Sequence, residues 1–145
     1  MGSFGLLEAD DLWVLPLAGR LVTQCRFDYA FTIIVGEREN SFEIRIEEPF
    51  EFRVGGGQRV TLDPEAEPGA MGPALTVLHQ TIDRAVAYKD GRLGVEFAGG
   101  GELRVPLGQR FEAWTLVGPT GLRIVSLPGG ELAIWSPDES GAASG

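Results

Sequence analysis

The stretch FEIRIE at residues 42–47 decides the fold class of this chain, because its apolar and charged side chains alternate without exception. A period of two places the three apolar side chains on one face of an extended strand and the three charged ones on the other. The stretch FEFRV at residues 50–54 repeats the pattern after a short turn. These stretches predict antiparallel strands with one face against a core and one face in water.

Strand signals continue on both sides of these two stretches. Upstream, β-branched and aromatic residues are concentrated in 21–27 and 30–35. Downstream, the Asp-Gly pair at 90–91 is a strong hairpin signal between strands predicted at 85–88 and 93–97. Further strands, separated by glycine-rich turns, are predicted at 102–105, 111–117, 122–126 and 131–135.

The hydrophobic period changes in only one segment, residues 73–86. Apolar residues recur there at steps of three and four positions, and the proline at 73 suits the first turn of a helix. The residues that set this period are Leu75, Leu78, Ile82 and Val86. We therefore expect one amphipathic helix near 73–86, with its apolar face covering a sheet.

The two halves of the chain resemble each other. The segment EIRI at 43–46 is followed by a Phe-Glu pair at 50–51, and ELRV at 102–105 is followed by a Phe-Glu pair at 111–112. This match indicates an ancient duplication of a four-stranded meander. Convergence is the alternative, because any two amphipathic strands share some of this pattern.

The length of 145 residues fits a single domain. We expect a flexible N-terminal segment at 1–14, one β-rich domain at 15–136 and a disordered tail at 137–145. The duplication would place pseudo-repeats at about 20–62 and 84–135. The predicted fold is mainly β (α+β): an antiparallel barrel or a two-sheet sandwich made of two duplicated meander halves, with one helix.

The chain is acidic, with a formal net charge of −9, and six of its glutamates lie within residues 37–51. An acidic surface repels phosphate backbones, which disfavours nucleic-acid binding, and it attracts basic proteins. Acidity can also serve solubility alone. The candidate partner-binding residues are Glu43, Glu47, Glu48 and Glu51.

Composition also bears on the compartment. No apolar run reaches the roughly 18 residues of a membrane-spanning helix, and no secretory signal opens the sequence. The only cysteine, Cys25, allows no internal disulfide, which fits a reducing compartment. We therefore expect a cytoplasmic protein that does not bind a membrane. An unpaired strand edge could support a homodimer.

The sequence contains few candidates for catalysis. His79 is the only histidine, so a metal site with two imidazole ligands cannot form. A general base oriented by Asp83, with Cys25 or Ser126 as nucleophile, is one interpretation of His79; a surface histidine is the other. No nucleophile-elbow or phosphate-loop motif is present. The sequence favours a non-enzymatic protein without catalytic residues, metal or cofactor.

Two functional hypotheses follow from these features. The first is an interaction protein, of immunity or regulatory type, that binds a basic partner protein through the acidic surface. The alternative is a small-molecule-binding β-barrel, either a carrier or a cofactor-free cyclase or isomerase. In that alternative Tyr29, Trp114 and Trp135 would line a ligand cleft between the two halves.

The ending LPGGELAIW at 127–135 is the most specific part of a family resemblance. Together with LAGRLVT at 17–23, LDP at 62–64 and FEAW at 111–114, it resembles a family of small bacterial proteins of unknown function over roughly 15–135. The resemblance implies no activity, cofactor or site residue. A looser resemblance, of class only, is to the acidic immunity partners of contact-dependent toxins.

Overall fold

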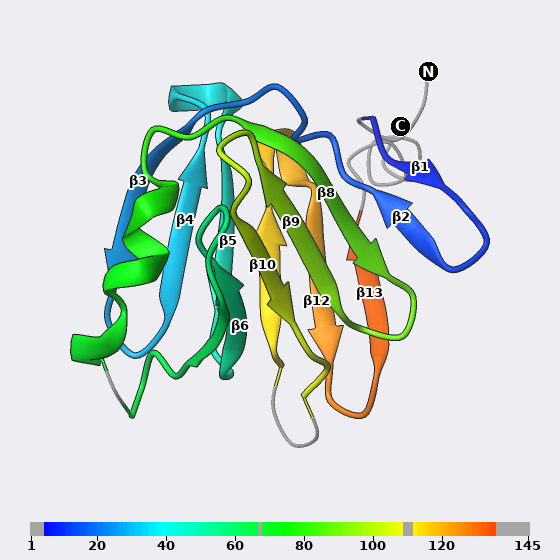
Figure 1. Cartoon of the computed structure of the whole chain (residues 1–145). Coiled ribbons are helices and arrows are strands. Elements are labelled where there is room, and N and C mark those ends of the chain that lie inside the picture. The colour runs from blue at the N-terminus through cyan, green and yellow to red at the C-terminus, as the bar shows by residue number, and fades with distance from the viewer. Residues whose placement is uncertain (1–4, 67, 109–111, 136–145) are drawn as a thin grey trace, which may run out of the picture.

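The computed structural model describes residues 5–66, 68–108 and 112–135. They form two antiparallel sheets that share one hydrophobic core (Figure 1). The order in the seven-stranded sheet is β1 (Leu7–Glu8), β2 (Leu12–Val14), β8 (Ile82–Tyr88), β9 (Leu93–Phe97), β10 (Glu102–Val105), β6 (Phe50–Arg53) and β7 (Arg59–Leu62). The order in the six-stranded sheet is β13 (Glu131–Trp135), β12 (Arg123–Leu127), β11 (Trp114–Val117), β5 (Phe42–Ile46), β4 (Phe31–Val35) and β3 (Val22–Phe27). Over these residues neither sheet closes into a barrel, and the arrangement is compatible with a two-sheet sandwich.

The alternation that predicts strands is confirmed by the burial of β5 and β6. The three apolar side chains of β5 are buried, and its two charged side chains are partly exposed. Both phenylalanines of β6 are buried as well. The ring of Phe50 stacks on Phe31 of the facing sheet, with 5.6 Å between the ring centroids. Burial of this apolar surface, at about 25 cal/mol per Å², is the main force that joins the two sheets.

The prediction of an amphipathic helix at 73–86 is wrong. The structure has a short 3-10 helix, η3 (Gly72–Val77), then a turn, and then strand β8. Leu75 and Leu78, which suggest an apolar helix face, are exposed. The β-branched Ile82 is buried in β8 instead.

Backbone pairing explains why the helix does not continue. His79 has a φ of 68°, in the left-handed region that a right-handed helix cannot contain. The amide of His79 donates to the carbonyl of Val22, and the amide of Ile82 donates to the carbonyl of Arg20. These backbone groups are therefore used in pairing with a distant segment. The other 3-10 helices of the described residues are η1 (Arg38–Asn40), η2 (Pro68–Ala70) and η4 (Pro119–Gly121).

Each half of the chain forms a three-stranded meander in one sheet and then crosses to the other sheet. Strands β3, β4 and β5 are neighbours in the six-stranded sheet, and the chain then adds β6 and β7 to the seven-stranded sheet. Strands β8, β9 and β10 are neighbours in the seven-stranded sheet, and the chain then adds β11, β12 and β13 to the six-stranded sheet. As a result β11 pairs with β5, and β6 pairs with β10.

These registers change one detail of the predicted match between the halves. Glu51 lies opposite Arg104, whereas Thr115 lies opposite Arg45. If β5 corresponds to β10, the position that corresponds to Glu51 is therefore Thr115. The predicted counterpart, Glu112, lies two residues before the start of β11.

The hairpin predicted from the Asp-Gly pair connects β8 to β9 and also contacts the opposite sheet. Gly91 has a φ of 105°, which suits glycine. Its carbonyl oxygen accepts hydrogen bonds from Trp114 Nε1 at 2.9 Å and from Ser126 Oγ at 2.7 Å. Both donors belong to fully buried side chains of the six-stranded sheet. These bonds satisfy buried polar groups and fix the hairpin against β11 and β12.

The N-terminal segment that the sequence predicts to be flexible, residues 1–14, contains two strands of the seven-stranded sheet. Strand β2 pairs with β8, and β1 pairs with β2. Leu6 is buried in the core. The tail predicted at 137–145 lies outside the described residues. Within the described ranges no helix has the length and apolar character needed to cross a membrane.

Candidate functional site

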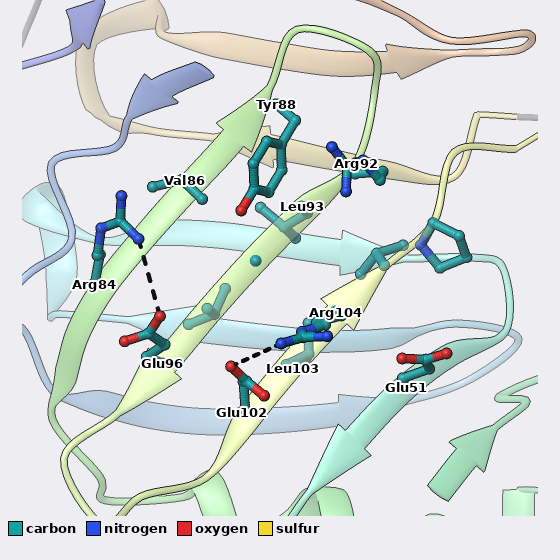
Figure 2. A pocket seen from close by; sticks show the side chains of 14 residues that line it. Glu51, Arg84, Val86, Tyr88, Arg92, Leu93, Glu96, Glu102, Leu103 and Arg104 are labelled. Carbon is teal, nitrogen blue, oxygen red and sulfur yellow. Dashed lines mark hydrogen bonds and ion pairs between the residues drawn. The ribbon is translucent and has the colours of Figure 1, made fainter. Parts of the chain in front are cut away.

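A groove of about 480 Å³ crosses the outer face of the seven-stranded sheet. Figure 2 shows that it extends over β8, β9, β10 and β6, and that charged side chains surround it. This volume lies within the range of roughly 300–1,000 Å³ that is usual for small-molecule sites. A second hollow, at the ends of β6 and β9 beside η3, measures only about 70 Å³. The groove is therefore the better candidate site.

The floor of the groove is open because β9 has a glycine at this position. Gly94 lies in register between Val86 of β8 and Arg104 of β10. Its φ is outside the left-handed region, and an added Cβ would meet side-chain atoms of Val86 and Tyr88 at 3.6 and 3.7 Å, which are ordinary contact distances. The backbone therefore does not require glycine here. Since glycine inside a strand costs roughly 0.5–1 kcal/mol relative to alanine, this position gives up stability and leaves space.

Tyr88 and Arg92 form one wall of the groove. The guanidinium carbon of Arg92 lies 4.3 Å from the centroid of the Tyr88 ring, a cation–π contact. Arg92 Nε donates hydrogen bonds to both carboxylate oxygens of Asp90, at 3.1 and 2.9 Å. These bonds hold the pKa of Asp90 below its ordinary value. In Figure 2 the Tyr88 hydroxyl lies near Val86, and among the described residues it has no hydrogen-bond partner.

Two arginines on either side of β9 are loosely paired. Arg84 Nη1 lies 4.0 Å from Glu96 Oε2, and Arg104 Nη2 lies 3.4 Å from Glu102 Oε2. The exposed fraction of the side chain is 50% for Arg84 and 54% for Arg104. Exposed ion pairs contribute roughly 0–1 kcal/mol. Either guanidinium could therefore exchange its carboxylate for an anionic ligand at little cost.

Glu102 has the least exposed side chain among the carboxylates of the groove, and three guanidinium groups surround it. Arg59 Nη2 lies 2.6 Å and Arg53 Nη2 lies 3.6 Å from Glu102 Oε1, while Arg104 approaches the other oxygen. Burial alone would raise the pKa of Glu102. The hydrogen bond from Arg59 and the charges of Arg104 and Arg53 together hold that pKa below its ordinary value. Glu102 is therefore ionised at neutral pH.

Replacement of Glu102 by glutamine is expected to lower the free energy of unfolding at pH 7 by roughly 1–2 kcal/mol, because three guanidinium groups lose their shared anion. The folded-state pKa is lowered, so the wild-type advantage is complete above the unfolded pKa of about 4.3 and is lost as the pH falls through the folded-state value. Urea unfolding of both proteins between pH 7 and pH 2 measures this difference. The control is Glu96→Gln, whose pair spans 4.0 Å and is half exposed. A Glu102→Gln difference that is constant across the pH range would contradict these ion pairs.

The four glutamates predicted to bind a partner do not form one surface. Glu43 lies in β5 and Glu47 directly follows that strand; Arg26 lies 3.9 Å from Glu43 and Arg45 lies 3.5 Å from Glu47. Glu48 is in the turn between β5 and β6. Glu51 is on the outer face of the seven-stranded sheet, where it lines the groove. The partner-binding role of these residues stays a prediction.

The three aromatic residues predicted to line a cleft lie apart. Trp114 is fully buried, and its indole bonds to the carbonyl of Gly91. Tyr29 is 78% exposed in the turn between β3 and β4, and Trp135 is 53% exposed at the end of β13. None of the three lines the groove or the smaller hollow. The structure does not bring them together.

The residues considered for catalysis are also dispersed. His79 lies in the turn before β8 and Asp83 lies within β8, so the helical contact expected between them is not formed. Cys25 packs against the core from β3, and burial raises the pKa of its thiol, which disfavours the reactive thiolate. Ser126 is fully buried. Within the described residues, no three His, Cys, Asp or Glu side chains are placed to hold a metal ion.

Apart from Glu51, none of the groove residues is among the predicted site residues. The sequence contains one indication of the groove residues. In LGVEF at 93–97 the apolar residues point inward, so Gly94 stands at an outward position where a polar side chain is usual in a half-exposed strand. The neighbours of Gly94 across β8 and β10 depend on strand register, which the glycine itself does not reveal.

Comparison with known proteins places the chain in a family context. The model of a family of unknown function (DUF6188) matches residues 13–136, from within β2 to one residue past β13. All groove residues fall inside this range. A search of curated proteins and a search of solved structures found no match to the chain.

Proposed function

The chain belongs to DUF6188, a family of unknown function, and we propose from its groove that it is a non-enzymatic ligand-binding protein. One observation carries this proposal: a groove of about 480 Å³ passes over Gly94, a central-strand glycine whose added Cβ would meet Val86 and Tyr88 only at ordinary contact distances. Natural sequences accept such a local cost mainly at functional sites. The ligand would lie on the outer face of the seven-stranded sheet.

The chemistry of the groove lining supports recognition of a ligand more than reaction with it. The described residues that line the groove include no Ser, Cys, His or Lys, so its only groups of the kinds that act as nucleophiles or bases are three carboxylates and one phenol. The pKa of Glu102 is lowered, so its carboxylate cannot act as a general acid at neutral pH. The remaining polar groups are guanidinium groups, carboxylates and one phenol, all suited to hydrogen bonding.

Replacement of Gly94 by leucine is expected to abolish ligand binding and to leave the fold intact, because the new side chain fills the floor. The alanine variant is expected to be more stable than the wild type by roughly 0.5–1 kcal/mol. A thermal-shift screen of a metabolite library measures binding. We expect compounds that raise the Tm of the wild type and leave the Tm of Gly94→Leu unchanged.

The matched control is Thr115→Leu, on the central strand β11 of the other sheet. It adds a similar side chain away from the groove and should keep the wild-type response. The proposal is wrong if no compound raises the Tm of the wild type. It is also wrong if every active compound raises the Tm of Gly94→Leu equally.

A basic protein partner is the second candidate, and the net charge of −9 favours it. Glu43 and Glu47 are each about two-fifths exposed, but arginines next to them reduce their local field. An immunity-type or regulatory role would use this surface. Joint neutralisation of Glu43, Glu47, Glu48 and Glu51 should abolish such binding; unchanged binding would reject the candidate. A cytoplasmic location remains part of the proposal, supported by the single free cysteine.

We also infer that the two meanders arose by internal duplication. The support is that each meander is followed by a crossover, and that the next strand pairs with the last strand of the other meander. Under this interpretation the groove formed on one meander only. Its counterpart on the six-stranded sheet carries Thr32 in β4, opposite Arg45, where the strand of the groove has Gly94 opposite Arg104.

A further inference from the structure

We propose that the groove binds a small planar organic anion, with its ring on the floor at Gly94 and its anionic group at Arg104. This inference rests on the proposed function and names the class of ligand. Two independent features of the described residues carry it: the guanidinium groups around the groove, and the floor that Gly94 and Val86 form beside the ring of Tyr88.

The groove is more cationic than the rest of this acidic protein. Its charged lining residues and their ion-pair partners comprise five arginines and four carboxylates, a local balance of +1 in a chain of net charge −9. The arginines are Arg53, Arg59, Arg84, Arg92 and Arg104, and the carboxylates are Glu51, Asp90, Glu96 and Glu102. The lining residues alone balance, with three arginines and three glutamates, so the groove repels an anion much less than the rest of the chain does.

Arg104 is the guanidinium best placed for a ligand that lies over Gly94. Its only carboxylate partner among the described residues is Glu102, at 3.4 Å, and Arg59 holds that same carboxylate at 2.6 Å. Arg92, in contrast, is bound to both oxygens of Asp90. Because a guanidinium has five donors in a planar fork, Arg104 retains free donors for a carboxylate or phosphate group. It also lies directly across from Gly94 in the register of β9 and β10.

The floor suits a ring. Neighbouring strands lie about 4.8 Å apart, so the side chains of β8 and β10 that flank Gly94 are separated by roughly 10 Å. That width accommodates one ring lying over the glycine backbone. Val86 supplies an apolar contact on one side, and the ring of Tyr88 comes close enough that a Cβ on Gly94 would lie 3.7 Å from its Cε2. The unpaired Tyr88 hydroxyl adds a hydrogen-bonding group at the edge of this floor.

The test uses four naphthalene probes that share one ring system: 2-naphthoate, 2-naphthyl phosphate, the neutral 2-naphthalenemethanol and the cationic 2-naphthylmethylammonium. Binding to the full-length protein is followed by amide shifts in ¹H–¹⁵N spectra. We expect at least one anion to shift amides of β8, β9 and β10, with a Kd at least tenfold lower than that of the neutral probe. The tighter of the two anions identifies the anionic group as a carboxylate or a phosphate.

Arg104→Gln should weaken the binding of the anion about tenfold and leave the neutral probe unchanged. The matched control is Arg26→Gln, because Arg26 is similarly exposed and loosely paired, at 3.9 Å from Glu43, on the other sheet. Gly94→Leu should abolish the shifts for every probe. Unfolding curves verify that all three variants are folded.

The outcomes separate this inference from the proposed function. The neutral or cationic probe could bind as tightly as the anions or more tightly, with shifts that Gly94→Leu removes. That result overturns the inference that the ligand is an anion, and the proposed ligand-binding function stands. Shifts confined to residues outside the groove overturn the inference as well. If none of the probes binds, the anion inference falls, and the metabolite screen with Gly94→Leu decides the proposed function by itself.

Discussion

Replacement of Trp114 by alanine is expected to lower the free energy of unfolding by about 3–5 kcal/mol. The indole is fully buried between the sheets, so its removal leaves a large cavity. It also removes one of the two hydrogen bonds that the carbonyl oxygen of Gly91 accepts. Chemical denaturation followed by circular dichroism measures the effect. Trp135→Ala is the matched control, because Trp135 is 53% exposed in the same sheet and should cost far less.

Trp114→Phe separates the volume of the side chain from its hydrogen bond. It keeps most of the ring and removes the donor, so we expect a loss of roughly 1–3 kcal/mol. Ser126→Ala removes the second donor to the same oxygen. The two substitutions share one acceptor, so their effects should not be additive. Additive effects, or a Trp114→Ala loss no greater than that of Trp135→Ala, would contradict the role of this contact between the sheets.

Replacement of Gly55 by alanine is expected to destabilise the fold by about 3 kcal/mol, at the upper end of the usual overpacking cost. A Cβ on Gly55 would lie 2.2 Å from the carbonyl oxygen of Gly99, and the neighbouring Cα of Gly100 would be 3.3 Å away. These are backbone atoms of the turn between β9 and β10, so no side-chain rotation can relieve the clash. Thermal unfolding measures the loss.

Gly72→Ala is the control for this substitution. Gly72 has no atom within 4 Å of an added Cβ, and its φ is outside the left-handed region. Its substitution should leave the Tm within experimental error. If Gly55→Ala were as stable as Gly72→Ala, the close approach of the two glycine-rich turns would be wrong.

The strands were predictable because their signal is local. In β5 and β9, apolar and non-apolar positions alternate within five residues, and the sheet buries the apolar set. The Asp-Gly hairpin was predictable for the same reason, since a tight turn depends on the conformations of its own residues. The structure of the segment 73–86 was not predictable in this way. Its apolar residues recur every three or four positions, and a 3-10 helix followed by a strand can have that spacing as well as an α-helix.

The candidate site was much less predictable than the strands. Glu51 is the single predicted site residue that lines the groove, and it was chosen for its charge among other glutamates. Trp114 was expected at a ligand cleft and instead occupies the core. Residue type alone cannot distinguish these locations, because a tryptophan in a strand suits a core and a cleft equally.

The β class, the position of most strands and the inward or outward direction of their side chains can be predicted from the amino-acid sequence, since these follow from the period of two along each strand. The pairing of β6 with β10, which brings Glu51 opposite Arg104, becomes visible only in the folded protein. The same holds for residues 79–82, which pair with residues 20–22 and not with one another in a helix. The physical reason is that strand pairing joins backbone groups distant in sequence, and every backbone group is chemically alike. Register is therefore chosen by the packing of the whole core, and the groove over Gly94 is a consequence of that register.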